Sequence, residues 1–323
     1  MKIPKKWLIT GGCGFIGTNL IKKLISQKNI FIRVIDNLSV GTRDDLASLL
    51  PLPSKNLPCV ELVVGDICDE KLALDATKDI DVIVHLAAST GVGKSVKDPK
   101  TDCMINIIGT LNYLEGARIN KTGKFIFASS GAAVGECQPP IHEESIPHPV
   151  SPYGASKLAG EAYCSSYYRT FGIETIILRF SNVYGPGSKR KDSVITKFMK
   201  RAMNGETLEI YGNGNQTRDF LYIEDLIQSI LLAVAKNDIG GEIFQIATSK
   251  ETTVYEIAQV IMEIEEKNFG NKVKIVNSKP RPGDIQRNYS NISKARKMLG
   301  YEPKKDLYVG LKDTFEYLKN FKN

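Results

Sequence analysis

Short apolar runs alternate with longer helix-like segments along the first half of the chain. The runs occupy residues 7–10, 31–35, 60–64, 82–86, 125–128 and 176–180. Runs of this length, bounded by glycine and polar residues, are typical of buried strands, and their alternation with helices is typical of a parallel sheet. The pattern therefore predicts an α/β fold built on a doubly wound parallel sheet.

The pattern becomes less regular in the second half of the chain. We expect a helix over 194–204 and a strand over 208–212, between long irregular stretches. This change predicts two domains. The first covers residues 1–181, with a returning segment near 220–248, and the second is a smaller mixed α/β domain over 182–323.

A glycine-rich turn follows the first expected strand. Gly11 allows a tight turn, Gly14 lets the backbone approach a diphosphate, and Gly17 lets a helix pack closely on the strand. The second strand ends in Asp36, where a carboxylate can bind the adenosine ribose hydroxyls. That carboxylate repels a 2′-phosphate, and Asn37 rather than arginine follows it. The sequence therefore predicts a Rossmann domain that binds NAD rather than NADP.

Polar and small residues stand at the ends of the later strands. In a doubly wound sheet, ligands bind beyond the carboxyl ends of the strands. We therefore expect Asp66 to approach the adenine, Ala87 and Ala88 the diphosphate on its adenosine side, and Ser129 and Ser130 the nicotinamide.

A tyrosine and a lysine four residues apart are the strongest candidates for chemistry. Tyr153 and Lys157 share one face if this segment is helical, so the lysine charge can favour the ionised phenol. A free tyrosine has a pKa of about 10 and is a poor base at neutral pH without such help. With Ser130, the pair can form a proton-transfer site.

Two arginines in the second half are candidates to bind a diphosphate. Arg218 lies in Arg-Asp-Phe, and Arg281 opens Arg-Pro-Gly-Asp284. Guanidinium groups match phosphate oxygens in geometry, although either residue could equally form a surface ion pair.

Composition narrows the class of protein. The chain has 323 residues, 42% of them hydrophobic, and a net charge of +7 with lysines scattered along it. We therefore expect an anionic substrate and no nucleic acid. Six cysteines without CxxC spacing and three histidines predict no metal and a reducing, cytoplasmic location. No signal peptide or membrane anchor is indicated, and the proline-rich stretch 51–58 is expected to be a surface loop.

Several motifs occur together from about residue 6 to 303. They are Thr10-Gly-Gly-Cys-Gly-Phe-Ile-Gly17, Asp66, His85-Leu-Ala-Ala88, Asn106, Ser129-Ser130, Tyr153-x-x-x-Lys157, Asn182-Val-Tyr-Gly-Pro186, Arg218-Asp-Phe and Arg281-Pro-Gly-Asp284. Together they resemble the extended short-chain dehydrogenase/reductases that act on nucleotide sugars, most closely the UDP-hexose 4-epimerases. The motifs and the resemblance imply a cofactor site made of Gly11, Gly14, Phe15, Ile16, Gly17, Asp36, Asn37, Asp66, Ile67, Leu86, Ala87, Ala88, Asn106, Ser129, Tyr153, Lys157, Phe180 and Val183.

The resemblance also implies the first chemical step. Tyr153 takes the proton of the sugar 4-hydroxyl while a hydride leaves C4 for NAD, Lys157 supports the tyrosine, and Ser130 holds the reacting oxygen. Related dehydratases and decarboxylases carry acidic residues after the serine, where this chain has Gly131 and Ala132. This difference disfavours both reactions.

Three hypotheses for the function remain once dehydration and decarboxylation are disfavoured. We expect a 4-epimerase that returns the hydride to the other face of a 4-keto sugar. The alternative is a 4-ketoreductase or C5-epimerase of keto-deoxy sugars. A protein that only senses NAD is less favoured, because such proteins typically lose the tyrosine or the lysine, and this chain keeps both.

Residue size suggests the substrate. Asn288 falls where the resembling epimerases place a gatekeeper, which is tyrosine in those limited to glucose and galactose. A smaller asparagine can admit and hydrogen-bond a 2-acetamido group, so we expect UDP-GlcNAc/UDP-GalNAc to be converted along with UDP-Glc/UDP-Gal. The substrate-binding residues expected are Thr90, Val92, Ser130, Gly131, Tyr153, Asn182, Arg218, Arg281, Asp284 and Asn288. The resemblance further implies a homodimer, formed through helices over 98–120 and 153–171.

Overall fold

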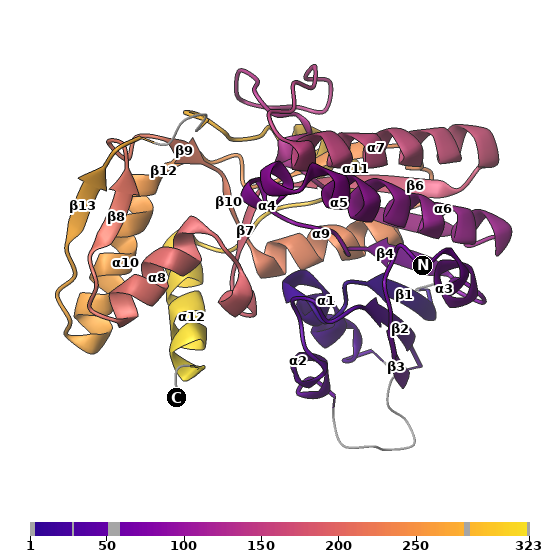
Figure 1. The fold of residues 1–323 in the computed structure, drawn as a ribbon, viewed down its shortest axis with the longest axis horizontal. Helices are drawn as coiled ribbons and strands as arrows, with labels where there is room; N and C mark the ends of the chain where they lie inside the picture. The colour runs from indigo at the N-terminus through magenta and orange to yellow at the C-terminus, as the bar shows by residue number, and fades with distance from the viewer. Residues whose placement is uncertain (1–3, 28, 51–58, 281–284, 322–323) are drawn as a thin grey trace.

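The computed structural model describes residues 4–27, 29–50, 59–280 and 285–321, so the stretch 51–58 lies outside the described residues. Its centre is a sheet of seven parallel strands (Figure 1). In spatial order they are β11 (Ile243–Ile246), β6 (Glu174–Phe180), β5 (Lys124–Ser130), β4 (Val82–His85), β1 (Lys6–Thr10), β2 (Phe31–Asp36) and β3 (Cys59–Val64). The predicted doubly wound parallel Rossmann sheet is therefore confirmed.

Both faces of the central strands β1 and β4 are buried, which explains why these strands are mostly apolar. Along β1, Trp7 and Ile9 pack into one core cluster and Leu8 into another, because successive strand side chains point to opposite faces. Helices α1 (Phe15–Leu24) and α9 (Ile223–Ala235) cover the first face. Helices α3 (Glu70–Ala76), α6 (Gly109–Ile119) and α7 (Pro152–Phe171) cover the second.

Helix α1 begins at Phe15, directly after the glycine turn. The glycines of the turn make this start possible. A Cβ atom added to Gly17 would lie 2.5 Å from the Gly11 carbonyl oxygen, so only glycine fits where the helix meets the turn. The first helical turn thus packs directly against the end of β1.

The second half of the chain forms a smaller group of helices and short strands on the left of Figure 1. Its helices are α8 (Val194–Met203), α10 (Val254–Phe269) and α12 (Leu307–Asn320), whereas α11 (Ser293–Leu299) contacts β11 of the large sheet and helix α9. Its strand pairs are β8 (Leu208–Tyr211) with β13 (Ile275–Ser278), β7 (Asn182–Tyr184) with β10 (Phe220–Tyr222), and β9 (Thr217–Arg218) with β12 (Thr252–Thr253). None of the described helices is both long and apolar enough to span a bilayer.

The chain returns to the large sheet after the first strands of this second group. Helix α9 packs on the sheet, and β11 adds its seventh strand beside β6. Buried Asp219 fixes the following segment, since its carboxylate accepts hydrogen bonds from the Thr248 and Ser249 amides at 2.8 and 2.9 Å. The division into domains over 1–181 and 182–323 stays a prediction.

Candidate active site

A cleft of about 1750 Å³ lies between the large sheet and the second group of elements. Most of the residues expected from the sequence line it. They are Gly11, Gly14, Phe15, Ile16, Gly17, Asp36, Asn37, Asp66, Ile67, Leu86, Ala87, Ala88, Thr90, Val92, Ser129, Ser130, Gly131, Tyr153, Phe180, Asn182, Val183, Arg218 and Asn288. Arg281 and Asp284 lie outside the described residues.

The glycine turn sits directly on the end of β4. Gly11 has a φ of +69°, and a Cβ atom there would lie 2.8 Å from the Ala87 amide nitrogen. Gly14 precedes α1 with extended backbone, and no side chain caps this helix end. The first-turn amides beside Phe15 are therefore available to an anion, as the binding of a diphosphate requires.

Acidic residues mark the far wall of the cleft. The Asp36 carboxylate accepts hydrogen bonds from the Cys13 and Leu38 amides at 2.9 and 2.8 Å, which fixes it at the end of β2. The Asn37 amide group donates to Asp66 at 2.9 Å. A hydrogen bond from the Cys68 amide is the main cause that lowers the pKa of Asp66. This wall repels phosphate and suits ribose hydroxyls.

Tyr153 and Ser130 meet at the other end of the cleft. Tyr153 lies in the first turn of α7, and Ser130 ends β5. Burial raises the pKa of Tyr153, a hydrogen bond with Ser130 lowers it, and the charge of Asp102 raises it further. The Ser130 hydroxyl also accepts the Ala132 amide at 3.2 Å, which orients it at the start of the short helix Gly131–Ala133.

Lys157 lies one turn further along α7, buried behind the wall of the cleft. Its ammonium donates to the Ala128 carbonyl at 2.9 Å. Burial lowers the pKa of Lys157 to about 8, against the opposing charges of Asp102, Cys164 and Glu161. That Lys157 favours the ionised form of Tyr153 stays a prediction.

Glu161 lies one turn beyond Lys157, and it was not identified from the sequence as part of the site. Its carboxylate accepts the Ser129 hydroxyl and pairs in a bidentate manner with Arg179 at 2.8 and 2.7 Å. Both charged side chains are only 3% exposed. The four-residue spacing of Tyr153, Lys157 and Glu161 is the signal that could have found it.

Asn106 occupies a supporting position rather than a lining one. It lies in a π-helical turn, Met104–Ile108, and is buried. Its side chain exchanges two hydrogen bonds with the backbone of Ser89, at 2.8 and 3.0 Å, and donates to Asp102 and Ser156. It therefore fixes the loop after β4, while Ser89 itself lines the cleft.

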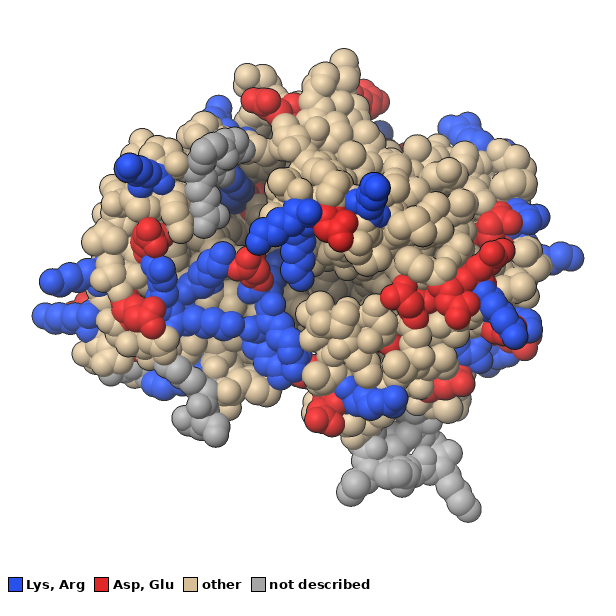
Figure 2. All heavy atoms as spheres, in the orientation of Figure 1, with Lys and Arg blue, Asp and Glu red and all other residues tan. Residues whose placement is uncertain are grey.

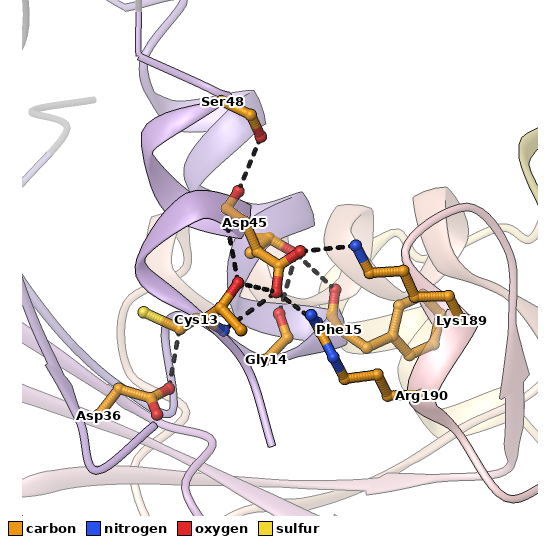
Figure 3. A network of polar contacts seen from close by, with 10 residues as sticks. Cys13, Gly14, Phe15, Asp36, Asp45, Ser48, Lys189 and Arg190 are labelled. Carbon is orange, nitrogen blue, oxygen red and sulfur yellow. Dashed lines mark hydrogen bonds and ion pairs between the residues drawn. The ribbon is translucent and has the colours of Figure 1, made fainter. Parts of the chain in front are cut away.

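An ionic bridge crosses the cleft beside the glycine turn (Figure 3). Asp45 of α2 (Arg43–Ala47) pairs with Lys189 at 2.8 Å and with Arg190, both from the short helix Ser188–Arg190 after β7. Burial alone would raise the pKa of Asp45, but hydrogen bonds from the two cations and Thr42 outweigh it and hold that pKa at about 2. The bridge joins the large sheet to the second group of elements.

Positive charge gathers along the hollow between the two groups of elements (Figure 2). The described cations that line the cleft are Lys22, Lys94, Lys97, Lys189, Arg190, Lys191, Lys197, Arg201 and Arg218. Arg218 donates to the Thr217 and Ile285 carbonyls at 2.7 and 2.6 Å. This lining attracts a ligand of high negative charge, such as a nucleoside diphosphate.

The model of the NAD dependent epimerase/dehydratase family matches residues 7–247. The chain belongs to this family. The family resemblance and the cofactor expected from the sequence are thereby confirmed, and NAD is the cofactor.

Similarity to individual relatives covers nearly the whole chain. A protein of Methanocaldococcus jannaschii named putative UDP-glucose 4-epimerase is 39% identical over 97% of this chain and 98% of its own length. The dTDP-D-glucose 4,6-dehydratase of Homo sapiens is 33% identical over 99% of this chain and 91% of its own length. The structure of a UDP-N-acetylglucosamine 4-epimerase from Methanobrevibacter ruminantium M1, in complex with UDP-N-acetylmuramic acid, has a TM-score of 0.88 and 30% identity, covering 99% of this chain and 100% of that one.

The cleft of this epimerase/dehydratase family member fits NAD. Gly11 and Gly14 let the turn pack closely on backbone, where a Cβ atom would meet Ala87 or the Gly11 carbonyl oxygen, and no side chain caps the N-terminus of α1 that follows. Asp36 is fixed at the end of β2, where a carboxylate would bind the ribose hydroxyls. Tyr153 and Ser130 line the opposite end, where a nicotinamide ring would have to lie for hydride transfer.

The Asp45 bridge generates a prediction about acid stability. Because its pKa falls from 3.8 in the unfolded chain to about 2, Asp45 stabilises the fold above pH 4, and this contribution is lost as the pH falls toward 2. We expect Asp45→Asn to lower the free energy of unfolding by about 2 kcal/mol at pH 7. Urea unfolding between pH 7 and 2.5 measures this, and the difference between the two proteins should shrink steadily toward the acid end.

Asp75→Asn is the matched control for Asp45→Asn. Asp75 also pairs with a lysine, Lys78, but both side chains are more than half exposed. Little change in stability is expected for this variant. An Asp45→Asn protein that unfolds like the wild type at pH 7 would show that the bridge contributes nothing.

Proposed function

We propose that the chain is an NAD-dependent UDP-sugar 4-epimerase. It interconverts UDP-GlcNAc with UDP-GalNAc and UDP-Glc with UDP-Gal. The observation that carries this proposal is the meeting of Tyr153 and Ser130 at one end of a large cationic cleft, next to two residues without acid or base chemistry.

Tyr153 and Ser130 act on the sugar 4-hydroxyl. The Tyr153 oxygen removes the hydroxyl proton and later returns it, while Ser130 hydrogen-bonds the same sugar oxygen and Lys157 supplies a nearby positive charge. The nicotinamide of NAD supplies reversible hydride acceptance from C4. Burial raises the pKa of Tyr153, so the mechanism requires the positive charge of Lys157 to favour the ionised phenol before Tyr153 accepts the hydroxyl proton.

Gly131 and Ala132 favour epimerisation over dehydration. Removal of water across C5 and C6 needs an acid and a base beside the sugar, and neither residue can move a proton. A Cβ atom added to Gly131 would have only the Phe180 carbonyl oxygen within 4 Å, at 3.8 Å. This space suits a 4-keto sugar that must turn over before it accepts a hydride on its other face.

Asn288 supports the wider substrate range. It is half-buried and lines the cleft together with Thr90, Val92 and Arg218. An asparagine leaves more room than a tyrosine and can donate a hydrogen bond to an acetyl carbonyl. The structural relative from Methanobrevibacter ruminantium, a UDP-N-acetylglucosamine 4-epimerase, agrees with this choice.

A homodimer is part of the same proposal. Large apolar side chains are exposed on and beside the helices expected to pair, and Met104, Ile119 and Phe171 are each about half exposed. Helices α6 and α7 lie next to each other and form one surface (Figure 1). A second copy of the chain would cover these side chains through the same surface.

Tyr153→Phe tests the role of the tyrosine in proton transfer. This variant keeps the ring but loses the proton-carrying oxygen, so epimerase activity should fall at least about 100-fold while NAD binding is retained. Coupled assays of UDP-Gal formation and NADH fluorescence titration measure the two effects. Tyr168→Phe, on the same helix but away from the cleft, should keep full activity. An active Tyr153→Phe protein contradicts the mechanism.

Substrate preference is tested with both sugar pairs. We expect turnover of UDP-GlcNAc/UDP-GalNAc at least equal to that of UDP-Glc/UDP-Gal. Asn288→Tyr should reduce the acetamido reaction at least about 10-fold and spare the other, because the larger ring fills the space of the acetyl group. Asn288→Ser keeps that space and should preserve both activities. Wild-type turnover confined to UDP-Glc/UDP-Gal would remove the gatekeeper argument.

Assembly is tested by light scattering after gel filtration. The wild type should have twice the 35.7 kDa mass of one chain. Met104→Glu places a charge in the proposed contact and should shift the mass to that of one chain. Val276→Glu adds the same charge on β13, which lies in the other half of the molecule, and should leave the dimer intact. A wild-type mass of one chain contradicts the proposal.

A further inference from the structure

Three consecutive cations follow β7, and the third has a different environment from the first two. Lys189 and Arg190 both pair with Asp45 across the cleft (Figure 3). The Lys191 ammonium instead donates to the Val183 carbonyl at 2.5 Å and lies 5.6 Å from the centre of the Phe15 ring. Lys191 therefore sits against the first residue of α1 and lines the cleft.

The surroundings of Lys191 lack a compensating negative charge. Burial is the one cause that lowers its pKa, to about 8, and no carboxylate in the described part of the chain forms an ion pair with it. The adjacent N-terminus of α1 carries partial positive charge of its own. Lys191 is partly buried and lies against Phe15, the first residue of α1, so its charge and the helix N-terminus are both better satisfied when an anion joins them.

The segment that carries Lys191 is held firmly against α1. The Asn19 side chain donates to the Pro186 carbonyl at 3.0 Å. A Cβ atom at Gly187 would lie 2.8 Å from that same Asn19 side chain, so the two segments are in close contact. The Asp45 bridge fixes the next two residues. The position of Lys191 is thus set before any ligand binds, which lowers the cost of binding.

We propose that Lys191 is a ligand for a nucleotide diphosphate in the cleft, acting together with the N-terminus of α1. This inference deepens the proposed function and rests on it for the identity of the nucleotides. Two diphosphates share this chemistry, that of NAD and that of the UDP-sugar. An ammonium beside the first residue of a helix, together with the uncapped amides of that helix end, provides the charge and the donors that a diphosphate requires.

Equilibrium binding tests the proposal without turnover. Lys191→Met removes the charge and keeps the apolar stem, Lys191→Arg restores a cation, and Lys23→Met makes the same charge change on the exposed side of α1. The dissociation constant of NADH is measured by fluorescence titration, and that of UDP by calorimetry. Thermal unfolding establishes that each variant is folded.

Lys191→Met should weaken the binding of NADH, of UDP or of both at least about 10-fold, as expected for the loss of a charged hydrogen bond. The ligand affected identifies which diphosphate Lys191 contacts. Lys191→Arg should recover most of the affinity, and Lys23→Met should stay within about twofold of wild type. Unchanged affinity of folded Lys191→Met for both ligands would overturn the inference.

Failure of the Lys191 assignment can be distinguished from failure of the epimerase assignment. A wild-type chain that binds NADH and UDP but converts no sugar contradicts the epimerase assignment alone, and the Lys191 result still stands. A wild-type chain that converts UDP-sugars while Lys191→Met binds both ligands normally contradicts the lysine assignment alone.

Discussion

The register of α7 on β5 is the constraint on which the chemistry depends. Successive turns of the helix meet the last three residues of the strand: Tyr153 meets Ser130, Lys157 binds the carbonyl of Ala128, and Glu161 accepts the hydroxyl of Ser129. Glu161 also forms a fully buried ion pair with Arg179 on β6. Breaking such a pair leaves an uncompensated charge, so the helix cannot slide without a large loss of stability.

A buried histidine fixes the neighbouring strand ends in a similar way. His85 ends β4, and its two ring nitrogens contact the hydroxyls of Thr10 and Thr110 at 3.0 and 3.2 Å. Burial lowers the pKa of His85 to about 3, so the ring stays neutral at physiological pH. The Thr10 hydroxyl also accepts the Ala87 amide, which places that residue against Gly11. The cofactor side of the cleft is therefore rigid independently of α7.

The sequence predicted the elements whose signals are local. Apolar runs located the strands to within a few residues, and the spacing of Gly11, Gly14 and Gly17 located the turn. The lining of the cleft was also largely anticipated, because the carboxyl ends of parallel strands meet at one edge. The sequence alone could not predict contacts between distant segments. Asp45 and Lys189 are brought together only by the fold, and Asn106 supports the cleft from behind because of a π-helical turn.

The seventh strand has a consequence for how the chain is made. β11 pairs with β6 only after more than sixty intervening residues, most of them belonging to the second group of elements, have been synthesised. Until then, β6 is an unpaired edge of a nearly complete apolar sheet, and exposed edges of this kind recruit other strands. A nascent chain therefore passes through a stage at which association with other chains competes with its own completion, and this exposure ends when β11 pairs with β6.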